Sequence, residues 1–96
     1  MKIRVKNNAN ISNKYIRFIK WKLFSLKEKF HYLSYAEVSL KKEGNSPTEY
    51  HAKVRLGIPD YDIIIKNKST NIWGLLYETD RDAYRYLAKN KERLTN

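Results

Sequence analysis

The sequence contains no cysteine, only two prolines and three glycines, and no long apolar run. Without cysteine, disulfide frameworks, cysteine-ligated zinc sites and thiol catalysis are excluded. The glycines lie too far apart to form a glycine-rich phosphate loop. Residues 1–6 alternate charged and apolar side chains, unlike a signal peptide, and no segment approaches the about 18 apolar residues that span a bilayer. We therefore expect a soluble, cytoplasmic protein without a membrane segment.

Groups that support catalysis are also scarce. The two histidines, His31 and His51, belong to no metal-spaced pair and no nucleophile–base set. Glu78, Asp80 and Asp82 cluster at helical spacing, which is typical of a solvated acidic face; a metal-binding carboxylate cluster is the alternative. The sequence therefore predicts a protein that is not an enzyme, with no catalytic residue, cofactor, metal site or small-molecule substrate.

Positive charge is the property that the sequence has in excess. Twenty Lys and Arg against ten Asp and Glu give the 96 residues a formal net charge of +10. A small domain needs a net charge of only about 2–8 for solubility, and the self-repulsion of a basic chain opposes compaction. The excess predicts a polyanionic partner. The alternative is a lysine-rich proteome that raises surface lysine in all of its proteins.

The apolar pattern predicts both strands and helices. Alternation of apolar and polar residues indicates strands, and apolar residues that recur every three to four positions indicate helices. Ser12 stands where a helix would begin, and Ser69, Thr70 and Asn71 are candidate caps of a second helix. The predicted elements are a strand over 2–6, a helix over 13–30, strands over 33–42, 50–58 and 62–66, and a helix that ends near residue 92.

This β-α-β-β-β-α order predicts a single α+β domain over residues 1–96. Short turns link the last three strands, so these strands run antiparallel. Both helices can then cover one face of a four-stranded sheet. The result is a two-layer sandwich like that of double-stranded RNA-binding domains.

Basic residues gather in three places of this predicted fold: the first helix, the end of the last helix and the uncovered sheet face. Phosphate contacts need only positive charge within reach. The sheet face lacks the paired aromatics of sheet-based RNA readers, so we expect the helices to form the main contact surface. The three sets are Lys14, Arg17, Lys20, Lys22, Lys27 and Lys29; Arg81, Arg85, Lys89, Lys91 and Arg93; and Lys2, Arg4, Lys6, Lys41, Lys53 and Arg55.

Two aromatic residues, Trp21 and Phe24, fall outside the apolar arc of the first helix and among its cations. Exposed aromatics in a basic field can stack on bases. They can equally fold over the edge of the sheet as boundary packing. Of the two interpretations we favour the packing.

The order and spacing of several short patterns resemble the ribosome hibernation-promoting factor and ribosome-associated inhibitor (protein Y, sigma-54 modulation protein) family. The resemblance spans nearly the whole chain, although each pattern alone is degenerate. The residues that carry it are Ser12, Phe18, Ile19, Lys22, Leu26 and Phe30 of the first helix; Leu40 and Lys41; Ile58 and Pro59; Ile72 and Trp73; and the run from Arg85 to Lys91.

This resemblance implies a ribosome-associated, RNA-binding regulator of translation that acts under stress. Such a protein binds rRNA of the small ribosomal subunit in the channel used by mRNA and tRNA, and so preserves idle ribosomes. It also implies the short form of the family, monomeric when free. The basic positions Lys22, Arg85, Lys89 and Lys91 carry over from the family pattern. To these we add three neighbours on charge alone: Lys20, Lys29 and Arg81.

Two positions depart from the family pattern. Asp80 stands within the apolar arc of the last helix, and Ala83 is smaller than the usual residue. An unpaired buried carboxylate is costly. Either Asp80 finds a cation, or the helix is broken or rotated at Thr79, with Asp80 as a new N-cap. The aromatic residues that could supply the missing bulk are Trp73, Tyr77 and Tyr84.

Two other functions compete with ribosome binding. A general double-stranded RNA-binding module has a similar fold, but acids rather than lysines occupy the first half of the last helix here. A protein-interaction or inhibitor module would use Trp21, Phe24 and some of the eight tyrosines as an interface, because such anchors are enriched in aromatic residues.

Overall fold

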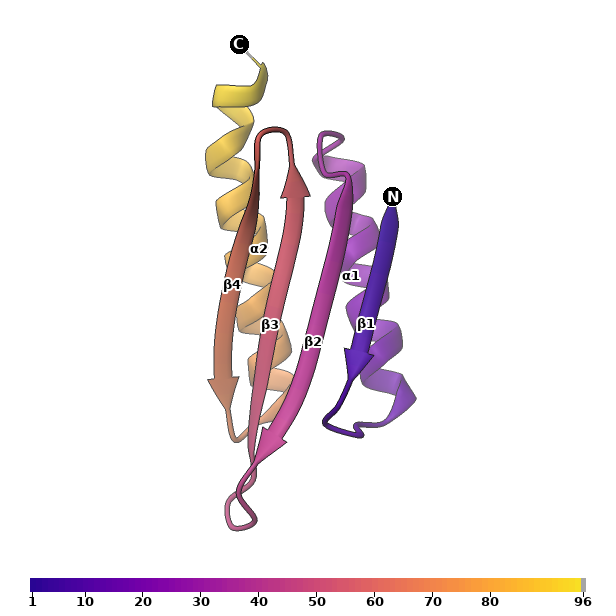
Figure 1. The fold of residues 1–96 in the computed structure, drawn as a ribbon, viewed down its shortest axis with the longest axis vertical. Helices are drawn as coiled ribbons and strands as arrows, with labels where there is room; N and C mark the ends of the chain where they lie inside the picture. The colour runs from indigo at the N-terminus through magenta and orange to yellow at the C-terminus, as the bar shows by residue number, and fades with distance from the viewer. Residues whose placement is uncertain (96) are drawn as a thin grey trace.

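A four-stranded sheet with two helices on one face forms the fold in the computed structural model (Figure 1). The structure describes the backbone of residues 1–95 and the side chains of residues 1–91. The elements are β1 (Lys2–Asn7), α1 (Asn13–Lys29), β2 (Tyr35–Glu43), β3 (Glu49–Ile58), β4 (Tyr61–Ser69) and α2 (Ile72–Thr95). This order confirms the predicted α+β sandwich.

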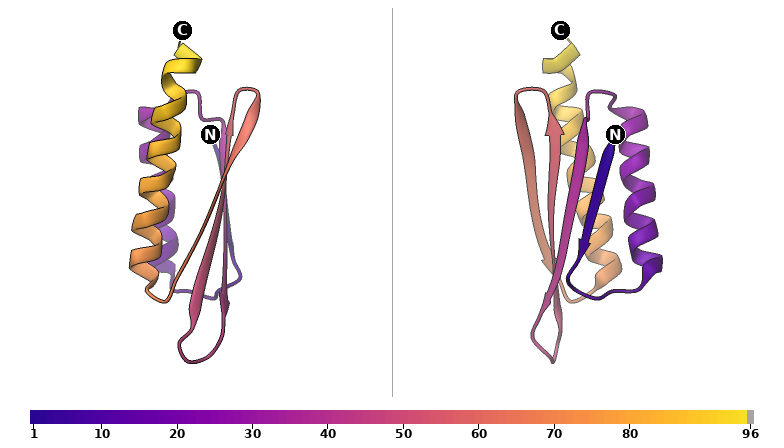
Figure 2. Two further views of the ribbon diagram at one scale, coloured as in Figure 1. Left: turned by 90° about the vertical axis from the view of Figure 1, so that its left-hand side faces the viewer. Right: turned by 45° about the vertical axis from the view of Figure 1, so that its right-hand side comes forward.

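The strands lie in the order in which they occur in the chain. β1 runs parallel to β2, β2 runs antiparallel to β3, and β3 runs antiparallel to β4. Parallel neighbours require a crossover connection, which α1 supplies between β1 and β2. Figure 2 shows that α1 and α2 both cover the same face, so the other face of the sheet is open.

The core lies between the helices and the covered face of the sheet. Alternate residues of β2 and β3 point into it, as predicted, and Leu33, Leu56, Leu75 and Leu87 have no exposed surface. Burying apolar surface of this kind is the dominant favourable term in folding. Among the described residues, no helix is long and apolar enough to cross a lipid bilayer.

The fourth strand is longer than the sequence predicts, because it pairs with β3 along its whole length. Asn67, a polar residue at an inward position, interrupts the alternation that would have indicated its second half. The Asn67 amide donates hydrogen bonds to Thr79 Oγ1 at 3.2 Å and to Asp82 Oδ2 at 3.0 Å. These bonds satisfy the partly buried amide, so a polar residue continues the strand where the pattern predicts its end.

The helix starts differ in how they are capped. Ser12 occupies the N-cap of α1, as predicted, but its side chain makes no capping hydrogen bond. Of the candidate caps of α2, Asn71 takes the role, since Gly74 N–H donates to Asn71 Oδ1 at 3.0 Å. The side chain thereby satisfies one of the free N–H groups at the start of the helix.

Asp80 does not break the last helix, which is continuous from Ile72 to Thr95. Its carboxylate lies 3.6 Å from Lys22 Nζ of α1. The interpretation in which Asp80 finds a cation is therefore confirmed, and the interpretation with a new helix start is wrong. A cation on the neighbouring helix stabilises the carboxylate, so the helix need not rotate.

Candidate nucleic-acid interface

The predicted cations of α1 lie on two different sides of the helix. Lys22 and Lys29 line the seam between the helices, where they contact Asp80 and Tyr84 of α2. Lys20 precedes Lys22 by two residues, which turns its side chain by about 200° around the helix axis. The structure therefore does not bring Lys20 together with the other two.

Lys22 already has several partners within the protein. Its ammonium pairs with Asp80 and lies 5.8 Å from the ring centre of Phe18 and 5.1 Å from that of Trp21. The side chains of Lys22 and Asp80 are 30% and 25% exposed, so solvent screens the pair only in part. Lys22 therefore links the two helices through its ion pair, and less of its charge is available to an external phosphate than the sequence predicts.

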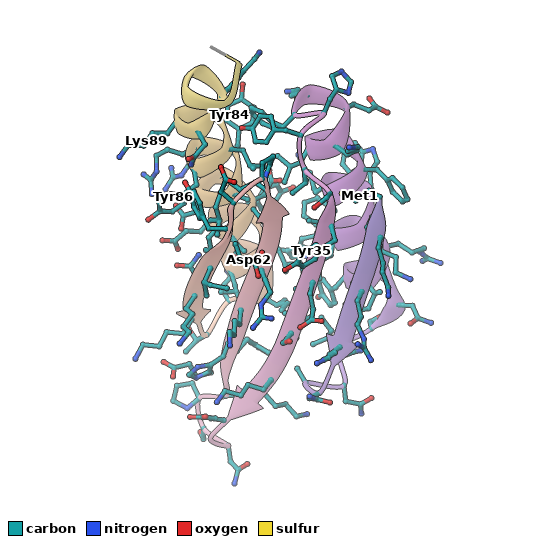
Figure 3. All side chains as sticks on the ribbon, turned by 45° about the horizontal axis from the view of Figure 1, so that its top comes forward. Met1, Tyr35, Asp62, Tyr84, Tyr86 and Lys89 are labelled. Atoms are coloured by element: carbon teal, nitrogen blue, oxygen red, sulfur yellow. The ribbon has the colours of Figure 1, made fainter. Side chains whose placement is uncertain are left out.

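Arg81, Arg85 and Lys89 follow one another at intervals of one turn along an exposed side of α2, which we call the outer ridge. Arg81 and Arg85, spaced by one helical turn, are exposed on the side away from the core, and Arg85 Nη2 pairs with Asp82 Oδ1 at 2.9 Å. Figure 3 shows Lys89 on the side of α2 that faces away from α1. Lys91 is exposed near the end of the described side chains. The side chain of Arg93 lies outside the described residues.

The seven predicted residues therefore do not form one compact patch. The ridge residue Arg81, with Lys20 and Lys89, makes no ion pair with another described residue. An unpaired surface cation keeps its full charge for a phosphate, whereas a paired one must first leave its partner. By this criterion Arg81 and Lys89 are the cations of α2 whose charge is least engaged within the protein.

Trp21 and Phe24 are 60% and 56% exposed, so the interpretation that they pack over the sheet edge is wrong. The only ring that Trp21 contacts among the described residues is Phe18, edge-on at 6.1 Å. Phe18 in turn meets Trp73 and Tyr77 of α2 at 5.3 Å each. Phe18 thus joins rings of both helices, and Trp21, Trp73 and Tyr77 stay open to solvent. None of Trp73, Tyr77 and Tyr84 lines the space beside Ala83.

A third basic surface lies on the open face of the sheet. Lys2, Arg4 and Lys6 of β1 occupy exposed positions there, as predicted, together with Lys41, Lys53 and Arg55. Lys66, at the end of the predicted strand, and Lys68, in the part of β4 beyond it, also belong to this face, and neither was among the predicted cations. A groove of about 380 Å³ crosses this face and is lined in part by Ser39, Lys53 and Lys66. Lys66 falls at an outward position of the predicted strand, so the pattern could have revealed it. Lys68 could not be found in this way, because Asn67 interrupts the alternation.

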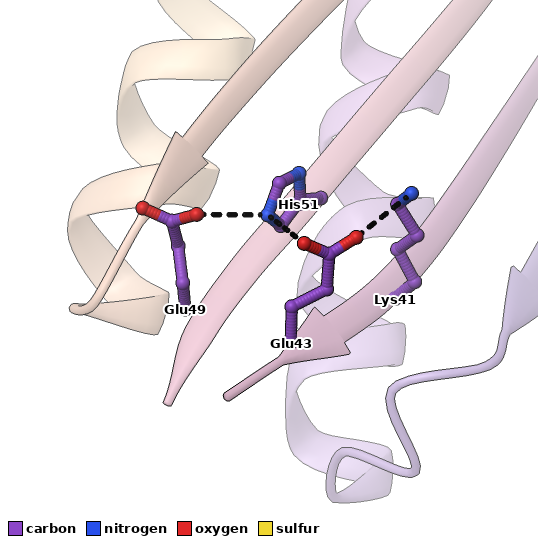
Figure 4. Close-up of polar contacts among 4 residues, drawn as sticks. All are labelled: Lys41, Glu43, Glu49 and His51. Carbon is purple, nitrogen blue, oxygen red and sulfur yellow. Dashed lines mark hydrogen bonds and ion pairs between the residues drawn. The ribbon is translucent and has the colours of Figure 1, made fainter. Parts of the chain in front are cut away.

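One end of this face carries a small polar network around His51 (Figure 4). His51 Nε2 lies 3.0 Å from Glu49 Oε1 and 3.7 Å from Glu43 Oε2, and Lys41 Nζ lies 3.2 Å from Glu43 Oε1. The hydrogen bond and charge of Lys41, with the charge of His51, lower the pKa of the Glu43 carboxyl. Within the described residues, no His, Asp and Glu side chains are grouped to hold a metal ion.

Solved structures share this arrangement although sequence comparisons do not detect them. No protein-family model and no curated protein matches the sequence. A ribosomal subunit interface protein from Coxiella burnetii superimposes with a TM-score of 0.79, at 15% identity, over 96% of this chain and 99% of that one. The Protein Y N-terminal domain from Thermus thermophilus does so with a TM-score of 0.72, at 13% identity, over 92% and 93%. The chain shares the fold of both proteins. The fold that the sequence resemblance implies is thereby confirmed.

Proposed function

We propose that the protein is a ribosome-associated hibernation factor of the protein Y family that binds small-subunit rRNA through its basic helices. The observation that carries this proposal is the shared fold, over nearly the full length, with a ribosomal subunit interface protein and a Protein Y domain. The net charge of +10 supports it, because a polyanion is the partner that such a charge favours. Binding in the cytoplasm to the mRNA and tRNA channel would block translation.

The unpaired cations of the helices supply the proposed contacts. Arg81 and Lys89 of α2 and Lys20 of α1 are exposed, so they can reach phosphates without breaking an ion pair. Arg85 is 67% exposed and shares its charge with Asp82. Lys22 would contribute least, since Asp80 and two aromatic rings hold its ammonium. The ranking of contacts therefore differs from one based on sequence position alone.

The test is co-sedimentation of the purified protein with ribosomal subunits at two salt concentrations. Each neutralised phosphate contributes about 0.7–0.9 to the slope of log affinity against log salt. Arg81→Gln with Lys89→Gln removes two contacts, so the slope should fall by about 1.4–1.8. The matched control, Lys2→Gln with Lys42→Gln, removes the same charge outside the helices. Equal slopes for the two variants would reject the site, and no association with either subunit would reject the function.

A protein-interaction module is the second candidate, because the structure leaves several aromatic rings open to solvent. Trp21, Phe24 and Tyr77 are 60%, 56% and 57% exposed. Aromatic residues are enriched among the anchors of protein interfaces. Under this alternative, association would be insensitive to salt and would be lost in Trp21→Ala. A general duplex-binding module would instead bind bare double-stranded RNA as tightly as it binds ribosomes.

A further inference from the structure

The register of the sheet places lysines side by side on its open face. Lys53 of β3 stands directly opposite Lys66 of β4, and Ser39 stands between Lys53 and Lys6 of β1. The adjacent row contains Lys41, His51 and Lys68. We call these side chains, Lys6, Ser39, Lys41, Lys53, Lys66 and Lys68, the lysine groove. They come from all four strands, so only the folded sheet assembles them.

The lysine groove opposes folding of the free protein. Like charges that stand directly opposite on neighbouring strands destabilise a sheet. Part of this cost is offset, since Lys6 pairs with Glu37 at 3.7 Å and Lys41 pairs with Glu43 at 3.2 Å. Among the described residues, no ion pair reaches Lys53, Lys66 or Lys68. The repulsion between Lys53 and Lys66 is therefore unrelieved until an anion binds.

The shape of the groove fits a phosphate backbone better than a base. A cavity of about 380 Å³ lies here, and Ser39, with its short side chain, lines it together with Lys41, Lys53 and Lys66. No Phe, Tyr or Trp lines this cavity among the residues that the structure describes, and the imidazole that does, His51, is held by Glu49 and Glu43. Recognition of unstacked bases relies on aromatic platforms, whereas phosphates need only donors and positive charge. We propose that the lysine groove binds the phosphate backbone of an RNA strand, separately from the helices.

The two binding surfaces would face in opposite directions. The helices cover one face of the sheet and the lysine groove lies on the other (Figure 2). One RNA strand cannot pass through the sheet, so the domain would lie between two RNA segments. This inference concerns RNA itself and does not require the ribosome to be the partner.

The experiment measures binding of a short single-stranded RNA, about 12 nucleotides long, by fluorescence anisotropy over a range of salt. Lys53→Gln with Lys66→Gln should reduce the salt slope by about 1.4, at about 0.7 per contact. The control, Lys2→Gln with Lys42→Gln, has the same net charge and should keep most of the slope. The groove variant should also melt a few degrees higher than the wild type, because the repulsion is gone; this shows that lost binding is not lost folding.

Amide chemical shifts locate the contact. Titration with the RNA should move the amide signals of β3 and β4 around Lys53 and Lys66. Equal salt slopes for the two double variants, or an oligoglutamate of equal charge that binds as tightly as the RNA, would overturn the proposal. The protein could fail to associate with ribosomes while the RNA salt slopes of the two double variants still differ. That result would reject only the proposed function and would leave the lysine groove in place.

Discussion

At the scale of single residues, Gly57 allows a side chain to cross a strand. Tyr35 stands opposite Gly57, and its hydroxyl donates a hydrogen bond of 2.6 Å to Asp62 Oδ2 on the far strand. A Cβ at position 57 would lie 2.1 Å from Tyr35 Cε1, closer than any real contact. The bond to Asp62 is the main cause that raises the pKa of the Tyr35 hydroxyl. The absence of a side chain at Gly57 therefore leaves the space that the Tyr35 ring occupies.

Gly57→Ala should lower the free energy of unfolding by about 1–3 kcal/mol, because the ring of Tyr35 must move and lose its bond. In a Tyr35→Ala background the same substitution should cost nothing or stabilise by about 0.5 kcal/mol, since alanine loses less entropy than glycine in a strand. Urea denaturation of the four proteins measures this cycle. Equal costs in both backgrounds would place the effect of Gly57 in the backbone rather than in the ring contact.

Glu43 provides a pH-dependent contribution to stability. Because Lys41 and His51 lower its folded-state pKa, its contribution is present above the unfolded pKa and is lost as the pH falls through the folded-state pKa. The window lies below the ordinary glutamate pKa of 4.5. A carboxyl-detected titration should give Glu43 a lower pKa than a free glutamate, and Lys41→Gln should raise it. An unchanged Glu43 pKa in that variant would assign the shift to the other nearby charges, His51 and Lys68.

At the scale of elements, the seam between α1 and α2 is incompletely filled. A cavity of about 40 Å³ lies beside the Lys22–Asp80 pair and is lined by Ala83 of α2 and Val38 of β2, among others. Ala83 is 2% exposed, and its methyl group leaves space that a longer side chain would fill. Beside this cavity the ion pair between Lys22 and Asp80, rather than apolar contact, joins the two helices.

Ala83→Val should stabilise the protein, because the two added methyl groups enter this cavity. At about 24 cal/mol per Å³, filling it is worth about 1 kcal/mol, from which the lower helix propensity of valine subtracts about 0.5 kcal/mol. The control is Ala88→Val at an exposed position of the same helix, which carries the propensity cost alone. Thermal denaturation compares the two. If the Ala83→Val variant melts below the Ala88→Val variant, the seam cannot accept the added volume.

The sequence predicts the elements well and their contacts poorly. Alternation around Val38 and Val54 and the helical period through Leu23 predict the order and the inward faces, since both depend on local geometry. The predicted end of β4 was wrong because the inward Asn67 bonds to side chains of another element, α2. The partner of Lys22 and the facing pair of Lys53 and Lys66 depend on register and helix packing, which no local pattern encodes.

At the scale of the whole molecule, charge is distributed over an elongated body. The protein measures 49 × 20 × 18 Å, so the layer of helices and the open sheet face lie back to back across a short dimension of about 20 Å. At low salt the Debye length exceeds this thickness, and the two faces repel through the whole domain. Both faces would be neutralised only by polyanions on both sides.

Salt should therefore act in opposite directions on folding and on RNA binding. Between about 0.01 M and about 0.1 M salt the Debye length falls from about 30 Å to about 10 Å, below the short dimensions of the molecule. The melting temperature of the free protein should rise over this range, while its affinity for RNA falls because counterion release is less favourable at higher salt. Differential scanning calorimetry and the anisotropy titration measure the two trends on the same samples.

Lys53→Gln with Lys66→Gln should change both the melting temperature of the free protein and its affinity for RNA. Removing a directly opposed pair should raise the melting temperature at low salt more than Lys2→Gln with Lys42→Gln does, although both variants lose the same net charge. The stability gained by the groove variant and the RNA affinity that it loses come from the same two ammonium groups. A melting temperature that falls with salt would instead mean that ion pairs such as Lys22–Asp80 outweigh the self-repulsion of the basic surface.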